Sequence, residues 1–211
     1  MTGKIISVAQ QKGGAGKSTL AAHLAVALRL QGHPVGLVDI DPQKSLAYWF
    51  GQRSNQNRKL VDISFEDVDG WQASRRVQDL AEENDFVLVD CPPHAETDSK
   101  IAIRAADLVV MPVQPSSMDF QACRVTRDLA AKEDVPAIAV FNRLSPHQDV
   151  AQVVAEFGGG QPLTSAAQAL GNRVAYARAM AGGLTVLEMG GAGKAADEVR
   201  SLSVEILRAF A

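Results

Sequence analysis

The sequence predicts an α/β protein built on a mostly parallel, twisted sheet with helices on both faces. Runs typical of strands alternate with runs typical of helices along the whole chain, an order that favours a parallel sheet. The strand-like runs are almost continuously apolar, as expected of strands covered on both sides. Hydrophobic residues make up 46% of the chain and aromatic residues only 5%, so alanine, valine and leucine must fill the core. With 211 residues, we expect a single domain spanning residues 1–211.

Composition restricts the classes of partner and compartment. The formal net charge is −3, so nucleic acid would have to bind a local cationic patch and not an overall basic surface. Cys91 and Cys123 are too few for a disulfide framework and are typical of a reducing compartment. No stretch approaches about 18 consecutive apolar residues, and no basic-then-apolar leader opens the chain. We therefore expect a cytoplasmic protein that does not bind membranes.

Apolar runs and their period predict the elements in order. A β-type run at residues 5–8 enters a glycine-rich turn, and residues 20–30 leave it with apolar side chains at helical spacing. The first half then continues with a strand at 35–39, a helix at 44–50, a polar loop at 51–59, a strand at 61–64, a helix at 71–83 and a strand at 86–90. The second half continues with a helix ending at 101–106, strands at 108–113 and 136–141, and helices at 118–132, 150–157, 172–181 and 195–210.

The turn after the first strand has the composition of a phosphate-binding loop. Glycines allow backbone N–H groups to converge on an anion at a helix N-terminus, where the helix dipole favours negative charge. The match to the pattern G-x-x-x-x-G-K-[S/T] is imperfect, because Gln11 stands where the first glycine would be. Lys17 is placed to reach the β- and γ-phosphates, and the Ser18 hydroxyl to ligate Mg²⁺.

Polar side chains follow three predicted strands at their carboxyl ends, where ligands bind in an open parallel sheet. Asp39 and Asp41 leave the second strand on alternate faces, and Asp41 taken alone also fits a helix cap before proline. Asp90 ends an apolar strand at a proline-broken turn, where an aspartate holds Mg²⁺, usually through a coordinated water. Asn142, at the end of a later strand, can donate and accept on the edge of a base, although asparagine is as common in a simple turn.

Three stretches together resemble the signature boxes of the ParA-type partition ATPases within the ParA/MinD family. In the loop, a second lysine, Lys12, precedes the paired glycines. Asn142 and Arg143 fall where that family reads adenine, and residues 173–188 resemble its C-terminal third. The three boxes are Lys12-Gly13-Gly14-Ala15-Gly16-Lys17-Ser18-Thr19, Asp39-Ile40-Asp41-Pro42-Gln43 and Val87-Leu88-Val89-Asp90-Cys91-Pro92-Pro93. The resemblance covers nearly the whole chain and implies a P-loop ATPase domain of the deviant Walker A type that uses ATP and Mg²⁺.

The resemblance also implies a homodimer that sandwiches ATP between its subunits. Lys17 would bind the phosphates in its own subunit, whereas Lys12 would reach across to those bound by the other, which makes hydrolysis depend on dimerisation. Asp41 would position the attacking water. Ser18, Asp39 and Asp90 would organise the metal ion, with Ser18 as the direct ligand. The nucleotide would contact Gly13, Gly14, Ala15, Gly16, Lys17, Ser18, Thr19, Asn142 and Arg143, with Thr19 at the α-phosphate.

Family members hold nonspecific DNA as ATP-bound dimers, and a partner protein on a cargo stimulates hydrolysis. The resemblance therefore implies nucleoid association and a ParB-like or cargo-adaptor partner, with a plasmid, chromosome region, protein cluster or microcompartment as cargo. Cations of the C-terminal third are the candidates for DNA contact, and each also fits an ordinary solvated charge: Arg173, Arg178, Lys194 and Arg200. Because the P-loop strand opens the chain, we expect no N-terminal helix-turn-helix arm.

Two other functions stay open at this stage. A MinD-like membrane-associated spatial regulator would use a basic amphipathic tail, but residues 201–211 carry Glu205 and a single arginine, Arg208. A P-loop metabolic enzyme would share the fold and the nucleotide site. However, no acceptor-binding motif is present, and Cys91 and Cys123 do not match the paired cysteines of the iron protein of nitrogenase.

Overall fold

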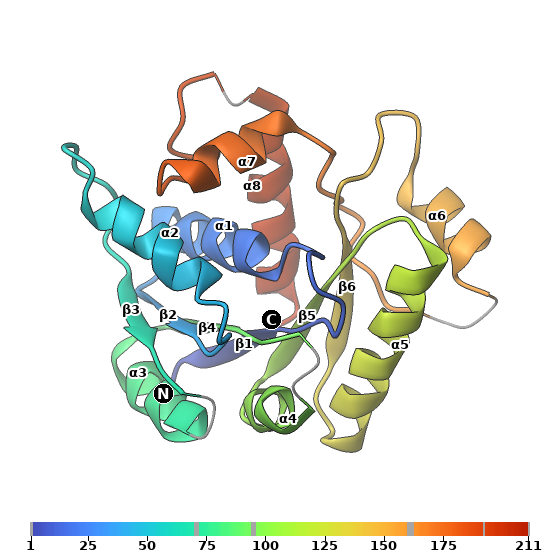
Figure 1. The fold of residues 1–211 in the computed structure, drawn as a ribbon, viewed down its shortest axis with the longest axis horizontal. Helices are drawn as coiled ribbons and strands as arrows, with labels where there is room; N and C mark the ends of the chain where they lie inside the picture. Colours follow the sequence, from blue (N-terminus) through green and yellow to red (C-terminus); the bar gives the residue numbers. More distant parts are fainter. Residues whose placement is uncertain (1, 70–71, 94–95, 160–162, 192, 211) are drawn as a thin grey trace.

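A six-stranded sheet forms the middle layer of the protein (Figure 1). The structure, a computed structural model, describes residues 2–69, 72–93, 96–159, 163–191 and 193–210. All strand pairs are parallel and follow the order β3-β2-β4-β1-β5-β6. The strands are β1 Lys4–Val8, β2 Val35–Asp39, β3 Ser64–Asp67, β4 Phe86–Asp90, β5 Leu108–Val113 and β6 Ala137–Phe141. The helices are α1 Lys17–Leu30, α2 Ser45–Ser54, α3 Ala73–Glu83, α4 Glu96–Arg104, α5 Ser117–Lys132, α6 Val150–Phe157, α7 Val174–Ala181 and α8 Gly193–Arg208.

Helices cover both faces of the sheet, as the sequence predicted. The core on one face is filled from α1, α2, α7 and α8, and the core on the other from α3, α4, α5 and α6. Alternate residues of a buried strand point to opposite faces. In β4, accordingly, Leu88 belongs to the first core, whereas Val87 and Val89 belong to the second.

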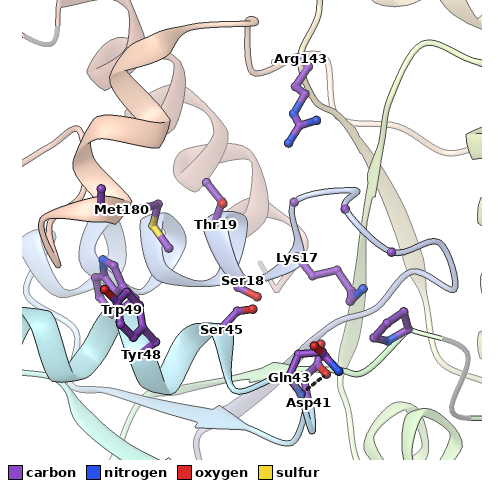
Figure 2. Close-up of a pocket in the computed structure, with 15 residues that line it drawn as sticks. Lys17, Ser18, Thr19, Asp41, Gln43, Ser45, Tyr48, Trp49, Arg143 and Met180 are labelled. Atoms are coloured by element: carbon purple, nitrogen blue, oxygen red, sulfur yellow. Dashed lines mark hydrogen bonds between the residues drawn. The ribbon is translucent and has the colours of Figure 1, made fainter.

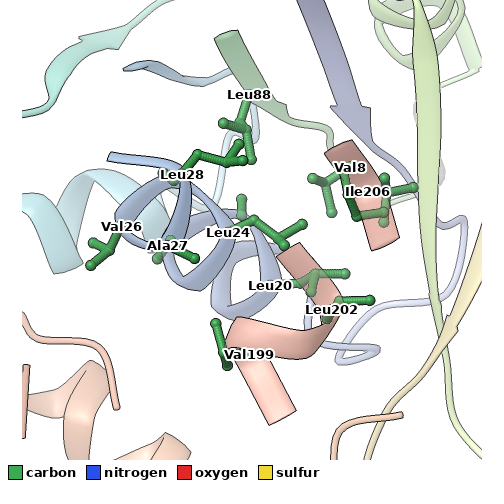
Figure 3. Packing of buried hydrophobic residues seen from close by; sticks show 14 of the residues in the cluster. Val8, Leu20, Leu24, Val26, Ala27, Leu28, Leu88, Val199, Leu202 and Ile206 are labelled. Atoms are coloured by element: carbon green, nitrogen blue, oxygen red, sulfur yellow. The ribbon is translucent and has the colours of Figure 1, made fainter. Parts of the chain in front are cut away.

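Helix α1 lies in the centre of the first core, between the sheet and α8 (Figure 3). Every residue from Leu20 to Leu28 is buried, so the helix is apolar on all sides and has no solvent-facing stripe in its middle. Leu24 and Leu28 pack toward Leu88 of β4, while Val199 and Leu202 of α8 cover the opposite side. The helix that begins at the glycine-rich loop is thus held rigidly by the core.

Strand register aligns the carboxyl ends of the three central strands. Val8 of β1 pairs with Asp90 of β4, and Asp90 in turn pairs with Asp39 of β2. Because all three strands are parallel, the loops that follow them leave from the same edge. The glycine-rich loop, Asp39 and Asp90 therefore meet at this edge.

Two predicted boundaries were wrong, and both lie in the middle of the chain. The strand expected at 61–64 is found at Ser64–Asp67, because this edge strand pairs only with β2 and its half-exposed side chains carry little apolar signal. The loop expected from residue 51 begins later, since α2 continues to Ser54 and buries Arg53 in a bidentate pair with Glu188 at 2.7 and 2.9 Å. The other bounds agree to within a few residues; residue 71, at the start of a predicted helix, lies outside the described residues.

Among the described residues, no helix combines the length and the apolar composition that crossing a membrane requires.

Candidate functional site

A cavity of about 480 Å³ opens at the carboxyl edge of the sheet, beside the glycine-rich loop (Figure 2). Lys17, Ser18 and Asp41 face this space together, although they come from α1 and from the loop after β2. Its lining is Gly13, Gly14, Gly16, Lys17, Ser18, Thr19, Asp41, Gln43, Ser45, Tyr48, Trp49, Pro93, Arg143, Met180 and Ala181. Most of the predicted nucleotide contacts are therefore brought together, while Ala15, Lys12, Asp39 and Asp90 are not part of the lining.

The N-terminus of α1 is left open toward a ligand. No side chain caps the helix, and no acidic residue stands in its first turn. The first N–H groups of a helix have no partner within the helix and, together with the dipole, favour an anion. Gly16 ends the loop with φ 99°, and a Cβ there would lie 2.3 Å from Nδ2 of Asn142. Glycine is required at this position by both backbone conformation and space.

Two amide side chains from later strands support the loop. Nδ2 of Asn142 donates to the carbonyl of Ala15 at 2.9 Å, and its Oδ1 accepts from the backbone N–H of Arg143 at 2.9 Å. Nε2 of Gln114 donates to the carbonyl of Gly14, also at 2.9 Å. Asn142, predicted as a base contact, thus also braces the loop. The role of Gln114 gave no signal in the sequence, because its partner lies 100 residues away.

Lys17 is buried between acidic groups. Burial lowers the pKa of Lys17, and the nearby charges of Asp90 and Asp41 act in the opposite direction. The side chain is only 6% exposed, so its ammonium has little contact with bulk water. An anion in the cavity would supply this ammonium with a counter-charge.

The carboxylate of Asp39 is engaged by the backbone. It accepts from the N–H of Asp41 through Oδ1 and from the N–H of Ala47 through Oδ2, both at 2.9 Å. Since Ala47 lies in the first turn of α2, Asp39 serves as a remote cap for that helix. Asp41 accepts from the N–H of Gln43 at 2.9 Å and lines the cavity. Asp39 thus fixes the loop, and Asp41 is the carboxylate at the cavity wall.

Asp90 is fully buried, and both of its carboxylate oxygens are without a hydrogen-bond partner among the described residues. Burial raises the pKa of Asp90 to about 8; the nearby Ser18 hydroxyl and the charge of Lys17 oppose this shift, and the charge of Asp39 adds to it. An orphaned buried carboxylate beside the loop suits a cation or its coordinated water. Within the described ranges, no cluster of three or more His, Cys, Asp or Glu side chains forms a complete metal site. A metal ion here would need ligands from water and from a bound phosphate as well.

Lys12 is not part of the cavity lining and forms an ion pair with Asp119 in the first turn of α5. Asp119 is fully buried, and its Oδ2 also accepts from the hydroxyl of Ser116. The Lys12 side chain remains 36% exposed. Asp119 was not identified from the sequence as the partner of Lys12. The local signal was its position three residues after Ser116. The Ser116 hydroxyl caps α5 by accepting a hydrogen bond from the N–H of Asp119.

A second chamber of about 350 Å³ adjoins the first, and Gly16, Thr19, Arg143 and Met180 line both. Its remaining wall comes from Asn142 and from the segment that leads into α7: Gly171, Asn172, Arg173, Val174, Tyr176 and Ala177. Asn142 and Arg143 therefore lie beside the loop, in the chamber next to the Lys17 cavity.

The four cations predicted to contact DNA all lie on α7 or α8 or at their ends. Arg173 binds Glu198, and Arg200 pairs with Asp197 at 2.9 Å on the surface of α8. Arg178 and Lys194 are exposed, in the last turn of α7 and the first turn of α8. Their role in DNA binding stays a prediction.

The fold and the loop define the P-loop NTPase class. The sequence model of the family described as ATPase MipZ matches residues 4–128. The maintenance of carboxysome distribution protein A of Halothiobacillus neapolitanus is 31% identical over 214 residues, which cover 96% of this chain and 95% of that protein. Protein ParA of Rhizobium radiobacter is 31% identical over 150 residues, 67% of this chain and 65% of that protein. The chain belongs to the ParA/MinD family of ATPases, as its motifs indicated.

The solved structures agree with the fold. The septum site-determining protein MinD of Pyrococcus horikoshii, complexed with Mg-ADP, is similar with a TM-score of 0.78 and 18% identity, covering 96% of this chain and 95% of that one. At this identity the likeness concerns the fold alone.

Proposed function

We propose that the protein is an ATPase that dimerises around Mg-ATP, holds nonspecific DNA in that state, and positions a cargo over the nucleoid. The observation that carries the proposal is the open N-terminus of α1 beside Lys17 and the orphaned carboxylate of Asp90. These groups are what a triphosphate and its cation would pair with. The Mg-ADP in the related MinD structure supports the same choice of ligand.

The residues in and beside the cavity have the chemistry that nucleotide hydrolysis requires. Loop N–H groups and Lys17 would hold the phosphates, and the Ser18 hydroxyl and Asp90 would hold Mg²⁺, Asp90 through a water. When bound, Mg²⁺ neutralises charge on the phosphates. Asp41, at the cavity wall, would orient the attacking water. Phosphoryl transfer depends mainly on such positioning and charge neutralisation, so no covalent intermediate on the protein is needed.

Lys12 links hydrolysis to dimerisation in this proposal. Its ammonium is held by Asp119 of its own chain and lies outside the cavity lining, so it would have to leave Asp119 to reach phosphates bound by a second subunit. An ATP-bound dimer would provide the new partner. Hydrolysis would therefore be slow until two nucleotide-bound chains meet.

Cargo positioning rests on the relatives. One is a carboxysome distribution protein and another is a ParA protein, which supports either a protein microcompartment or a plasmid or chromosome region as cargo. A ParB-like or cargo-adaptor protein would stimulate hydrolysis and release the DNA. Arg178 and Lys194 are exposed and are candidates for phosphate contact.

Binding to a random-sequence DNA duplex with ATP, ADP or no nucleotide, across a salt series, tests the proposal. We expect binding only with ATP, with log affinity falling by about 0.9 per phosphate contact for each log unit of salt. Lys194→Ala should weaken it, whereas Lys132→Ala, an exposed cation on α5 at the other face of the sheet, should not. Absence of binding in all three states, with ATP dimers seen by light scattering, would reject DNA as the matrix. Sedimentation with anionic liposomes and ATP then tests the MinD-like alternative.

A further inference from the structure

The wall of the second chamber is fastened to α8 by one carboxylate. Glu198 accepts from Nε of Arg173 at 2.9 Å, and Nη2 of the same guanidinium donates to the same oxygen, Oε1. Its other oxygen, Oε2, accepts from the backbone N–H of Gly171 at 3.1 Å and from the hydroxyl of Tyr176 at 2.9 Å. Glu198 therefore contacts three residues of the segment that lines the chamber.

Together with a hydrogen bond from the Tyr176 hydroxyl to the carbonyl of Ala195 at 3.2 Å, these contacts attach the segment to α8. Gly171 and Arg173 belong to an irregular stretch before α7. Its backbone forms a bridge with Leu144, whose carbonyl accepts from the N–H of Asn172 at 2.8 Å, but it is not held by helical hydrogen bonds. Burial alone would raise the pKa of Glu198, but hydrogen bonds from Arg173, Gly171 and Tyr176 and the charge of Arg173 lower it, so the carboxylate stays ionised. Hydrogen bonds to an ionised acceptor are about twice as strong as neutral ones.

Tyr176 extends the connection to the phosphate loop. Its ring packs edge-to-face on His23 of α1, with 5.2 Å between ring centroids. Nδ1 of His23 lies 2.7 Å from the carbonyl of Thr19. Because the backbone N–H of Val186 donates to Nε2 of His23 at 3.1 Å, Nδ1 carries the ring proton and donates to Thr19. The path from Glu198 thus ends at a residue that lines both chambers.

We propose that Glu198 is a positioning residue for the nucleoside end of the ligand, because it holds the Gly171–Arg173–Tyr176 wall of the second chamber at a fixed distance from the phosphate loop. The inference rests on the proposed nucleotide binding. The chamber carries polar groups, Asn142 and Asn172, and apolar surface from Val174 and other side chains, a mixture that suits a sugar and a base. In this arrangement Arg173 supports the chamber wall through Nε and Nη2.

The test compares ATP with inorganic tripolyphosphate, each with Mg²⁺, by isothermal titration calorimetry. Tripolyphosphate needs only the loop and Lys17, whereas ATP also needs the second chamber. Glu198→Ala should weaken ATP binding by about tenfold or more, as expected from the loss of several hydrogen bonds, and leave tripolyphosphate binding within about twofold. Asp197→Ala, which removes the neighbouring exposed carboxylate, is the matched control and should change neither.

Tyr176→Phe keeps the ring against His23 and removes only the hydroxyl. It should weaken ATP binding less than Glu198→Ala does and leave tripolyphosphate binding unchanged. This variant provides the test if Glu198→Ala folds poorly. Equal weakening of both ligands in these variants would make Glu198 a merely structural residue and overturn the inference. Unchanged ATP affinity would overturn it as well. Failure of the unmutated protein to bind either compound would instead overturn the proposed nucleotide binding itself.

Discussion

The ion pair between Lys12 and Asp119 gives the most direct test of how the site works. Lys12→Ala should leave ATP binding nearly intact, because Lys12 does not line the cavity. It should abolish ATP hydrolysis, because the lysine proposed to reach the other subunit's phosphates is gone. The same change should also destabilise the fold, since it removes the cation that faces a buried carboxylate.

The size of the destabilisation follows from the burial of the two partners. Breaking a fully buried pair costs about 3–5 kcal/mol, and a fully exposed pair contributes about 0.2–1 kcal/mol. Asp119 is fully buried, but Lys12 is 36% exposed and the Ser116 hydroxyl still donates to the carboxylate. We therefore expect Lys12→Ala to lower the free energy of unfolding by about 1–3 kcal/mol.

A second substitution separates stability from catalysis. Asp119→Asn removes the charge that Lys12→Ala leaves unpaired. The double variant with Lys12→Ala and Asp119→Asn should therefore regain most of the lost stability but should not hydrolyse ATP. Asp119→Asn alone frees Lys12 and should hydrolyse ATP at least at the parental rate. Urea unfolding followed by circular dichroism and a phosphate-release assay measure the two properties. Hydrolysis at the parental rate by Lys12→Ala, or its recovery in the double variant, would refute the cross-subunit role.

Three further substitutions test the loop, the metal site and a buried histidine. Gly16→Ala should lower the melting temperature and weaken ATP binding by at least about tenfold, because its Cβ would meet Nδ2 of Asn142 at 2.3 Å in a positive-φ conformation. Gly13→Ala, whose Cβ would meet nothing, should keep the parental melting temperature; similar melting temperatures for the two variants would contradict this reading. Asp90→Asn should lose the rise in melting temperature that Mg-ADP gives the parent, because the carboxylate proposed to hold the metal ion is gone; an undiminished rise would argue against a metal role for Asp90. Burial lowers the pKa of His23 from 6.5 to about 4, so the unfolded chain binds its proton first and stability should fall by on the order of 3 kcal/mol as pH drops from 6.5 to 4. Urea unfolding across that pH range should show a smaller fall in the free energy of unfolding for His23→Gln than for the parent. Equal pH profiles would exclude His23 as the cause of the fall.

Local patterns in the sequence were enough to find the fold class and most of the loop's groups. Buried parallel strands appear as short apolar runs, and the glycine-rich turn must be local because it connects adjacent elements. The carboxyl ends of parallel strands meet at one edge, so Asp41 and Asp90 could be assigned to the same region before any contact was known. Within the described residues, the bounds of the edge strand β3 and of the end of α2 were wrong, because burial there is partial or depends on distant residues.

The sequence alone thus determined an α/β fold with a phosphate-type loop, while the tertiary structure decided how that loop is held and which groups are free. Asn142, Gln114 and Asp119 reach the loop region from positions about 100 residues or more away, and Glu198 fastens a chamber wall from the last helix. Periodicity and spacing report the backbone neighbours of a residue. They carry no signal for side-chain pairs between elements that become adjacent only when the sheet and its helices pack.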